Sequence, residues 1–326
     1  MSSAAPDAAA EHGVVTYAYL GPRGTFSEAA LRAMPHAQGA HLEPYESVGA
    51  ALDAVRTELV TGALVPIENS VEGSVSATLD ELAHGEPLVI VDEYALPVSF
   101  MLMARPGVGL TDIRRLATHP HALAQCREWV AANLPGVHGI SALSTAHAAM
   151  SLNEDPPPYD AAIAPEVAAE HYQLKILARD IGDNDEASTR FVLVSRPGIT
   201  PEPTGADKTT LTLYMREDHP GALLEILTEF AVRGVNLTRI ESRPTKRALG
   251  DYYFSVDCEG HVEDARVGEA LMGLRRVCAD VRFVGSYSRH DGKEPHLRAG
   301  VTDADFAAAQ AWLARVRNAR QMLGTR

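Results

Sequence analysis

Apolar segments of strand length alternate with helix-like segments from Val14 onward. Residues 14–20 (VVTYAYL) have the pattern of a strand, and Thr25 and Glu28 behind them have the spacing of a helix-capping box. Residues 62–70 (GALVPIENS) form a second strand pattern, which enters a glycine-containing turn and another helical segment. Because strands that alternate with helices usually pair in parallel, the sequence predicts an α/β fold with a largely parallel sheet.

Two long apolar strands then follow each other between Leu88 and Met103 with only a short break. Such a pair is expected where a chain crosses from one lobe to another. Further strands and helices of the α/β type continue to a strand that begins near Thr189. We therefore predict two lobes with a cleft between them, resembling periplasmic binding proteins, over residues 14–195, with the crossover near 90–104.

A change of composition marks the end of this part of the chain. Residues 196–208 (RPGITPEPTGADK) are rich in proline, glycine and polar side chains, which is typical of a linker. Residues 209–288 follow the order βαββαβ, which predicts a second domain of ferredoxin-like topology. Residues 289–326 contain an amphipathic helix on a loose tether, and we treat them as a C-terminal tail.

Charge and cysteine content argue against several function classes. A formal net charge of −14 disfavours binding to nucleic acid or anionic membranes. Three cysteines without CxxC spacing support neither a disulfide framework nor a zinc knuckle. The first dozen residues lack a signal-peptide pattern, and no apolar stretch approaches the length of a membrane span. We therefore expect a cytoplasmic protein that binds neither nucleic acid nor membrane.

A series of motifs along residues 14–288 resembles the prephenate dehydratase family. In order, they are YLGPRGTFSEAA, VPIENSVEGSV, THPHALAQC, STAHAA, STRF, GALL and NLTRIESRP. The βαββαβ module is similar to the ACT regulatory domain of that family. Only thirteen residues precede Val14, so the chorismate mutase domain of bifunctional relatives is not expected.

Three positions depart from the family pattern. His121 stands where glutamine is common, Leu143 where some members have an acidic residue, and Thr118 where some have serine. We therefore assign no catalytic role to positions 121 and 143. His119 and His121 have a His-x-His spacing, but a third ligand is missing from the pattern, which favours capping or packing over a metal site.

The resemblance implies an enzyme that removes water and carbon dioxide from prephenate to give phenylpyruvate in phenylalanine biosynthesis, without metal or redox cofactor. Thr189 and Arg190 are the strongest catalytic candidates. Thr189 would hydrogen-bond the departing hydroxyl group. Arg190 would pair with a substrate carboxylate, because guanidinium suits bidentate contacts, or else form a structural salt bridge between lobes.

Glu68 and Asn69 complete the catalytic set, because they lie between a strand end and a helix. Asn69 can donate to a carboxylate or a ketone. Glu68 is either a proton donor whose pKa is raised by desolvation or an ionised partner of a basic side chain. Residues expected to bind substrate lie at similar strand and helix ends, where capping is the simpler alternative role; they are Ser70, Thr118, Gln125, Ser144, Thr145 and Phe191.

The resemblance also places phenylalanine between two ACT modules. The implied contacts are Gly221, Ala222, Leu223, Leu224, Asn236, Leu237, Glu241, Ser242, Arg243 and Pro244. Leu223 or Leu224 would pack on the ring, whereas at least one of the two is expected to fill the helix core. A shared site requires a homodimer or homotetramer.

Two alternatives remain open. One is arogenate dehydratase, whose substrate carries an amine in place of the ketone of prephenate and whose product is phenylalanine. The other is a non-catalytic amino-acid sensor, which the same fold can support. The sequence leaves open the sign of the response to aromatic amino acids.

Overall fold

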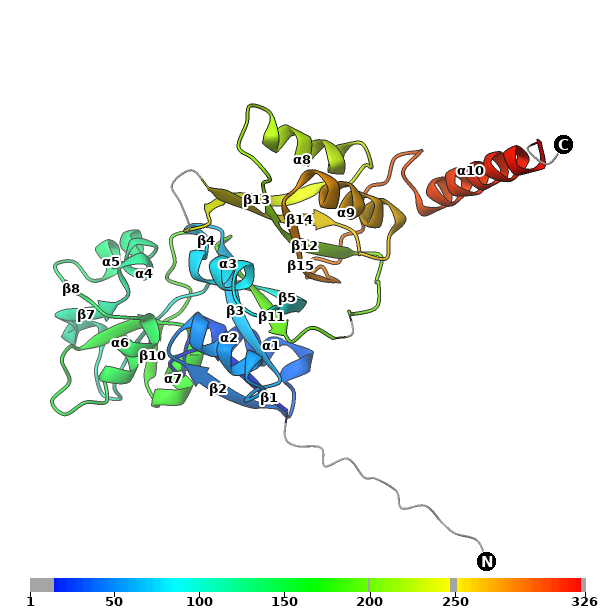
Figure 1. The fold of residues 1–326 in the computed structure, drawn as a ribbon. Helices are drawn as coiled ribbons and strands as arrows, with labels where there is room; N and C mark the ends of the chain where they lie inside the picture. The colour runs from blue at the N-terminus through cyan, green and yellow to red at the C-terminus, as the bar shows by residue number, and fades with distance from the viewer. Residues whose placement is uncertain (1–14, 199, 247–250, 324–326) are drawn as a thin grey trace, which may run out of the picture. The chain divides into compact units, whose positions relative to one another are not determined.

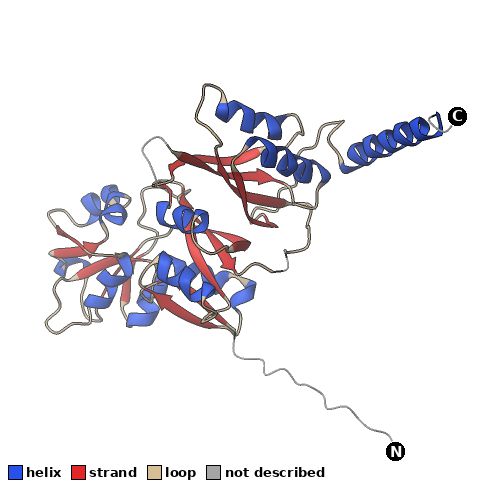
Figure 2. Ribbon diagram, in the orientation of Figure 1, coloured by secondary structure: helices blue, strands red, loops and turns tan. Residues whose placement is uncertain are grey.

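The computed structural model describes residues 15–198, 200–246 and 251–323. These residues form two compact units (Figures 1 and 2). The first unit contains the chain up to Thr78 and Tyr94–Phe191, and the second contains Leu79–Glu93 and the chain from Val192 onward. The segment Leu79–Glu93 lies between the two parts of the first unit in sequence, yet it packs with the C-terminal half of the chain.

The first sheet has the strand order β2-β1-β3-β11-β5, with the short β4 paired to β3. β1 pairs in parallel with both β2 and β3, as the alternating pattern predicted. The strands are β1 (Thr16–Leu20), β2 (His41–Tyr45), β3 (Gly62–Asn69), β4 (Gly73–Ser74), β5 (Val89–Pro97) and β11 (Ser188–Ser195). The helices of this region are α1 (Phe26–Ala33), α2 (Val48–Arg56) and α3 (Ser76–Ala83), with a short 3-10 helix at Pro35–Ala37.

The second sheet has the order β10-β6-β9-β7-β8 and mixes parallel and antiparallel pairs. Its strands are β6 (Met101–Ala104), β7 (Arg115–Thr118), β8 (His138–Ser141), β9 (Ala161–Ala164) and β10 (Lys175–Ala178). Its helices are α4 (Pro120–Ala124), α5 (Arg127–Asn133), α6 (Thr145–Ser151) and α7 (Glu166–Tyr172), after a 3-10 turn at Leu110–Asp112.

Both faces of this second sheet are covered by hydrophobic cores. Leu116 and Ile163 belong to one core, and their neighbours Ala117 and Ala164 belong to the other. Successive side chains of a strand point to opposite faces, so an uninterrupted apolar run is what a doubly covered strand requires. The predicted two-lobed α/β architecture is confirmed.

The second unit contains a four-stranded antiparallel sheet of order β13-β14-β12-β15. Its elements are β12 (Asp207–Tyr214), α8 (Ala222–Ala231), β13 (Leu237–Pro244), β14 (Tyr252–Glu259), α9 (Ala265–Val277) and β15 (Asp280–Ser288). The βαββαβ order is confirmed. A final helix, α10 (Asp303–Leu323), follows.

One expectation about α8 is wrong. Neither Leu223 nor Leu224 fills the core, since 39% and 66% of their surfaces are exposed. The buried residues of this helix are Ala222, Ile226 and Phe230, which repeat every four positions. That spacing turns one face inward and leaves both leucines outside it.

Within the described ranges, no helix combines the length and the hydropathy needed to cross a membrane.

Candidate active site

The end of β3 lies beside the beginning of β11. The Ser70 amide donates to the Ser188 carbonyl over 2.9 Å, and the Ser188 amide donates to Ser70 Oγ over 3.0 Å. This reciprocal pair holds together the two segments that carry the predicted catalytic residues. It therefore places Glu68, Asn69, Thr189 and Arg190 in one group.

Asn69 is oriented by the backbone that follows it. Its Oδ1 accepts hydrogen bonds from the amides of Val71 and Glu72, both at 2.9 Å. Backbone amides only donate, so the side-chain oxygen must face them and Nδ2 must face the other way. Nδ2 donates to Thr189 Oγ1 over 2.8 Å.

This contact leaves Thr189 as a donor toward any ligand. Its Oγ1 accepts from Asn69, and among the described residues Asn69 is its only hydrogen-bond partner. The hydroxyl proton is therefore available to another acceptor. Thr189 is 9% exposed, so little water competes for that proton.

Arg190 lies next to this pair and contacts Glu68. Its Nη1 is 3.4 Å from Glu68 Oε2, and the two side chains are 14% and 41% exposed. This contact agrees with the expectation that Glu68 is the partner of a basic side chain. It joins strands of one lobe rather than bridging two lobes.

The other residues expected to bind substrate have different environments. Thr118 is buried and donates to the Ile163 carbonyl over 2.7 Å, and Phe191 is 1% exposed. Ser144 caps α6 by accepting from the His147 amide, and Thr145 is the first residue of that helix. Gln125 ends α4, and its Oε1 is buried without a hydrogen-bond partner in the described structure. Ser70 is bonded to Ser188, the residue before Thr189, whereas the side chains of Thr118 and Phe191 are buried in the interior.

His119 has the capping role that the sequence favoured, because its Nδ1 accepts from the His121 amide at 3.3 Å. No group of three or more His, Cys, Asp or Glu side chains suited to a metal ion occurs in the part of the chain that the structure describes.

The contacts between the two lobes were not found by sequence reasoning. Glu28 in α1 lies 2.6 Å from His171 in α7, and it also accepts from the Gly24 amide over 2.7 Å. Burial raises the pKa of Glu28, but hydrogen bonds from Gly24 and His171 outweigh burial and lower it. Gly24 has φ of +84°, and a Cβ there would lie 3.0 Å from the Cα of Ala168. A side chain at this position would strain the backbone and would require a small shift of the neighbouring α7 residues.

A second contact between the lobes lies closer to the candidate site. The carboxylate of Glu72, which follows the Asn69 turn, is 2.7 Å from His121 Nδ1 in α4. His121 is thus close to the turn that orients Asn69.

In the second unit, two of the residues expected to bind an effector, Glu241 and Arg243, belong to an ion-pair cluster. Arg243 contacts Asp80 of α3 at 3.0 Å and Glu241 at 3.1 Å. Lys246 and the Tyr253 hydroxyl also reach Asp80, at 2.7 and 2.9 Å. Arg243 therefore has a structural partner that the sequence did not suggest. Gly221 starts α8 at φ of +98°, a conformation that glycine adopts without strain.

The fold and these contacts define a two-lobed α/β enzyme unit joined to a βαββαβ domain, with a hydroxyl group and a guanidinium group at a strand end. Residues 17–198 match the family model for prephenate dehydratase, and residues 209–276 match the model for the ACT domain. The chain belongs to the prephenate dehydratase family, and it is an enzyme of the dehydratase type.

Curated relatives are similar in sequence to this chain over nearly their whole length. A prephenate dehydratase of Amycolatopsis methanolica is 48% identical over 305 residues, which cover 93% of this chain and 98% of the relative. One of Mycobacterium tuberculosis is 45% identical over 312 residues, which cover 93% and 94%.

Two solved structures are similar to this chain over most of its length, and their descriptions differ. A prephenate dehydratase of Arthrobacter aurescens in complex with L-Phe is 54% identical, with a TM-score of 0.89 over 93% of this chain and 100% of that chain. A second protein, described as a quorum-quenching acylase and called GqqA, is 33% identical with a TM-score of 0.75, over 84% and 97%.

Proposed function

We propose that this chain converts prephenate to phenylpyruvate, carbon dioxide and water, and that phenylalanine bound to the ACT domain regulates it. The observation that carries the catalytic half is the Asn69–Thr189 hydrogen bond. It holds the Thr189 hydroxyl group in place before the substrate arrives, as electrostatic preorganisation requires.

The reaction needs such a donor at the leaving group. The bond from the ring to its carboxylate breaks, and the electron pair enters the ring. The ring carbon–oxygen bond then breaks, and the departing hydroxide takes up one proton, supplied ultimately by the solvent, to become water. Thr189 donates its hydrogen bond to this oxygen, while Arg190 attracts a carboxylate of the dianion.

The magnitude of this contribution is moderate. Proton donation to a leaving group contributes about 10²- to 10⁴-fold in rate, or roughly 3 to 5 kcal/mol. Aromatisation of the ring supplies the driving force, and the cleft contributes positioning. The electron pair that the departing carboxylate leaves in the ring is balanced by the pair that departs with hydroxide, so the proposed reaction needs no external oxidant or reductant.

The proposed regulation by phenylalanine is supported by a relative of known structure. The Arthrobacter aurescens protein was solved with L-Phe, and it is 54% identical to this chain. In this chain Leu223 and Leu224 are exposed, so both are accessible to an aromatic ring. We place the effector between the ACT domains of two copies, which makes a homodimer or homotetramer part of the proposal.

Residues 14–195 carry the proposed catalysis and residues 209–288 the effector site, with residues 196–208 as the linker. All three cysteines are free and buried. Free thiols suit the reducing cytoplasm in which we place the enzyme.

Turnover of prephenate and arogenate by the purified chain tests this function, with carbon dioxide release measured with and without phenylalanine. We expect prephenate to be preferred and phenylalanine to change the rate. An arogenate preference would identify the alternative dehydratase. Failure to release carbon dioxide from either substrate, with hydrolysis of an acylated amine instead, would contradict the proposal and favour the activity named for GqqA.

A further inference from the structure

Helix α10 (Asp303–Leu323) is attached to the second unit at one end. Its first residue accepts a hydrogen bond from the Ala265 amide at Asp303 Oδ1, over 2.9 Å. Just before the helix, Val301 is 6% exposed and lies against Gly234. Figure 1 shows the rest of α10 extending away from the four-stranded sheet of its own unit.

Beyond this attachment the helix displays large apolar side chains to solvent. Trp312, Leu313 and Val316 are 59%, 40% and 47% exposed. A single helix without tertiary packing is marginally stable in water, even when it is rich in alanine. Exposed apolar residues grouped on one helix usually mark an interaction surface. Helix α10 therefore has the properties of a helix that is completed by a partner.

The spacing of its apolar residues indicates another helix as that partner. Phe306, Ala309, Leu313 and Val316 recur at intervals of three, four and three residues, which places them on one narrow stripe. We call these four residues the α10 seam. Two helices with such seams can pack side by side with their apolar residues interlocked.

The charges along α10 indicate the direction of that pairing. Asp303 and Asp305 lie in its first turn, and Arg315 and Arg317 lie in its second half. A parallel pair would bring the two acidic turns together. An antiparallel pair instead brings the acidic end of each helix to the basic end of the other, which also suits the helix dipoles.

From these observations we infer that α10 is a self-association surface, at which the seams of two copies of this chain pack antiparallel. In one register Phe306 faces Val316 of the other copy, and Ala309 faces Leu313 of the other copy. The seam then maps onto itself, as two-fold symmetry requires. In this register Asp303 lies on the same flank of the pair as Arg317 of the other copy.

Disulfide trapping with two separately purified variants, Ala309→Cys and Leu313→Cys, tests the register. The native cysteines are buried, so the new thiols are the exposed ones. Oxidation of the mixed proteins should give a covalent dimer that contains one chain of each variant. Each variant alone should not form it, because like positions lie about 6 Å apart along the helix axis.

The matched control is the pair Ala307→Cys and Ala314→Cys, which lies on the opposite side of α10. This pair should stay monomeric in denaturing gels. Equal cross-linking of the control pair, dimers of Ala309→Cys with itself, or no mixed dimer would each overturn the inference.

Sedimentation of the full chain provides a measurement without oxidation. A variant with both Leu313→Ser and Val316→Ser should associate about tenfold more weakly than the unmodified chain, because interface-core residues are removed. Its turnover should be unchanged, since neither residue belongs to the candidate active site. Equal association of the variant and the unmodified chain would overturn the inference, whether or not the proposed catalytic function holds.

Discussion

The Asn69 amide donates to Thr189 Oγ1 over 2.8 Å, although the two residues are 120 positions apart in the chain. Two backbone amides hold the other end of the Asn69 side chain, which sets the direction of this donation. The relationship between these two side chains connects the turn after β3 with the start of β11.

Replacement of Thr189 by valine should lower kcat by about 10²-fold or more, because valine keeps the shape and loses the hydroxyl group. The control is Thr189→Ser, which keeps the hydroxyl and should remain within roughly tenfold of the unmodified enzyme. Steady-state turnover of prephenate measures both, with circular dichroism as a check on folding. A Thr189→Val enzyme with normal kcat would remove Thr189 from the mechanism.

Replacement of Asn69 by alanine should lower kcat because Thr189 loses its orientation. If Asn69 acts through Thr189, the double variant with Thr189→Val should be no slower than Thr189→Val alone. The double-mutant cycle is measured on kcat and on KM separately. Fully additive losses would show that Asn69 acts on the substrate independently of Thr189.

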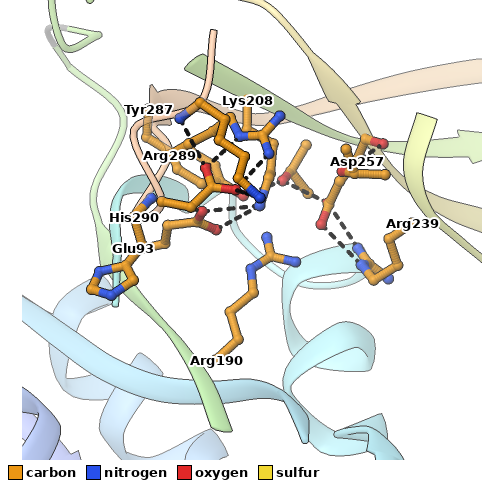
Figure 3. Close-up of polar contacts among 12 residues, drawn as sticks. Glu93, Arg190, Lys208, Arg239, Asp257, Tyr287, Arg289 and His290 are labelled. Carbon is orange, nitrogen blue, oxygen red and sulfur yellow. Dashed lines mark hydrogen bonds and ion pairs between the residues drawn. The ribbon is translucent and has the colours of Figure 1, made fainter. Parts of the chain in front are cut away.

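Removal of one partner from the buried ion pair of Glu93 and Lys208 should destabilise the protein. Lys208 Nζ lies 2.9 and 3.0 Å from the two carboxylate oxygens, and the side chains are 4% and 10% exposed (Figure 3). Lys208→Met should lower the free energy of unfolding by about 3 to 5 kcal/mol, because it leaves a buried charge without its partner.

Urea unfolding measures this effect. The double variant with Glu93→Leu and Lys208→Met should recover most of the loss, since it removes both charges together. The control is Lys293→Met, whose lysine is 76% exposed and should change stability by less than about 0.5 kcal/mol. A Lys208→Met protein as stable as the unmodified chain would contradict the prediction.

Asp80 should make the stability of the protein depend on pH in the acid range. Burial raises the pKa of this carboxyl group, but hydrogen bonds from Arg243, Lys246 and Tyr253 outweigh burial and lower it to about 2, from 3.8. Because the pKa is depressed in the folded state, the stabilisation is fully present above pH 4. It is lost as the pH falls from about 4 to about 2.

The variant Asp80→Asn tests this dependence. Above pH 4 its free energy of unfolding should be about 2 kcal/mol below that of the unmodified chain, at roughly 1.4 kcal/mol per pKa unit. The difference should shrink as the pH approaches 2. The control is Asp280→Asn, whose carboxylate is 62% exposed and pairs with Arg275 at the surface. A difference between Asp80→Asn and the unmodified chain that stays constant from pH 7 to pH 2 would exclude this explanation.

The order of the elements was determined by the sequence alone. The strand that begins at Ser188, the antiparallel βαββαβ domain and the cap at His119 all follow from local patterns of hydrophobicity and turn chemistry. These features depend on neighbours a few residues away, so they can be predicted without knowledge of the packing. The motifs likewise indicate the family without any three-dimensional information.

The partners of individual side chains were decided by the tertiary structure. Thr118 was a candidate ligand by its position, yet its hydroxyl group binds the Ile163 carbonyl in the interior. Leu224 was a candidate for the core, yet it is exposed, because the packing of α8 selects Ile226 and Phe230. The contacts of Glu28 with His171 and of Asp80 with Arg243 join residues more than 140 positions apart. Such pairs depend on how finished elements dock, a property of three-dimensional packing that a one-dimensional pattern does not contain.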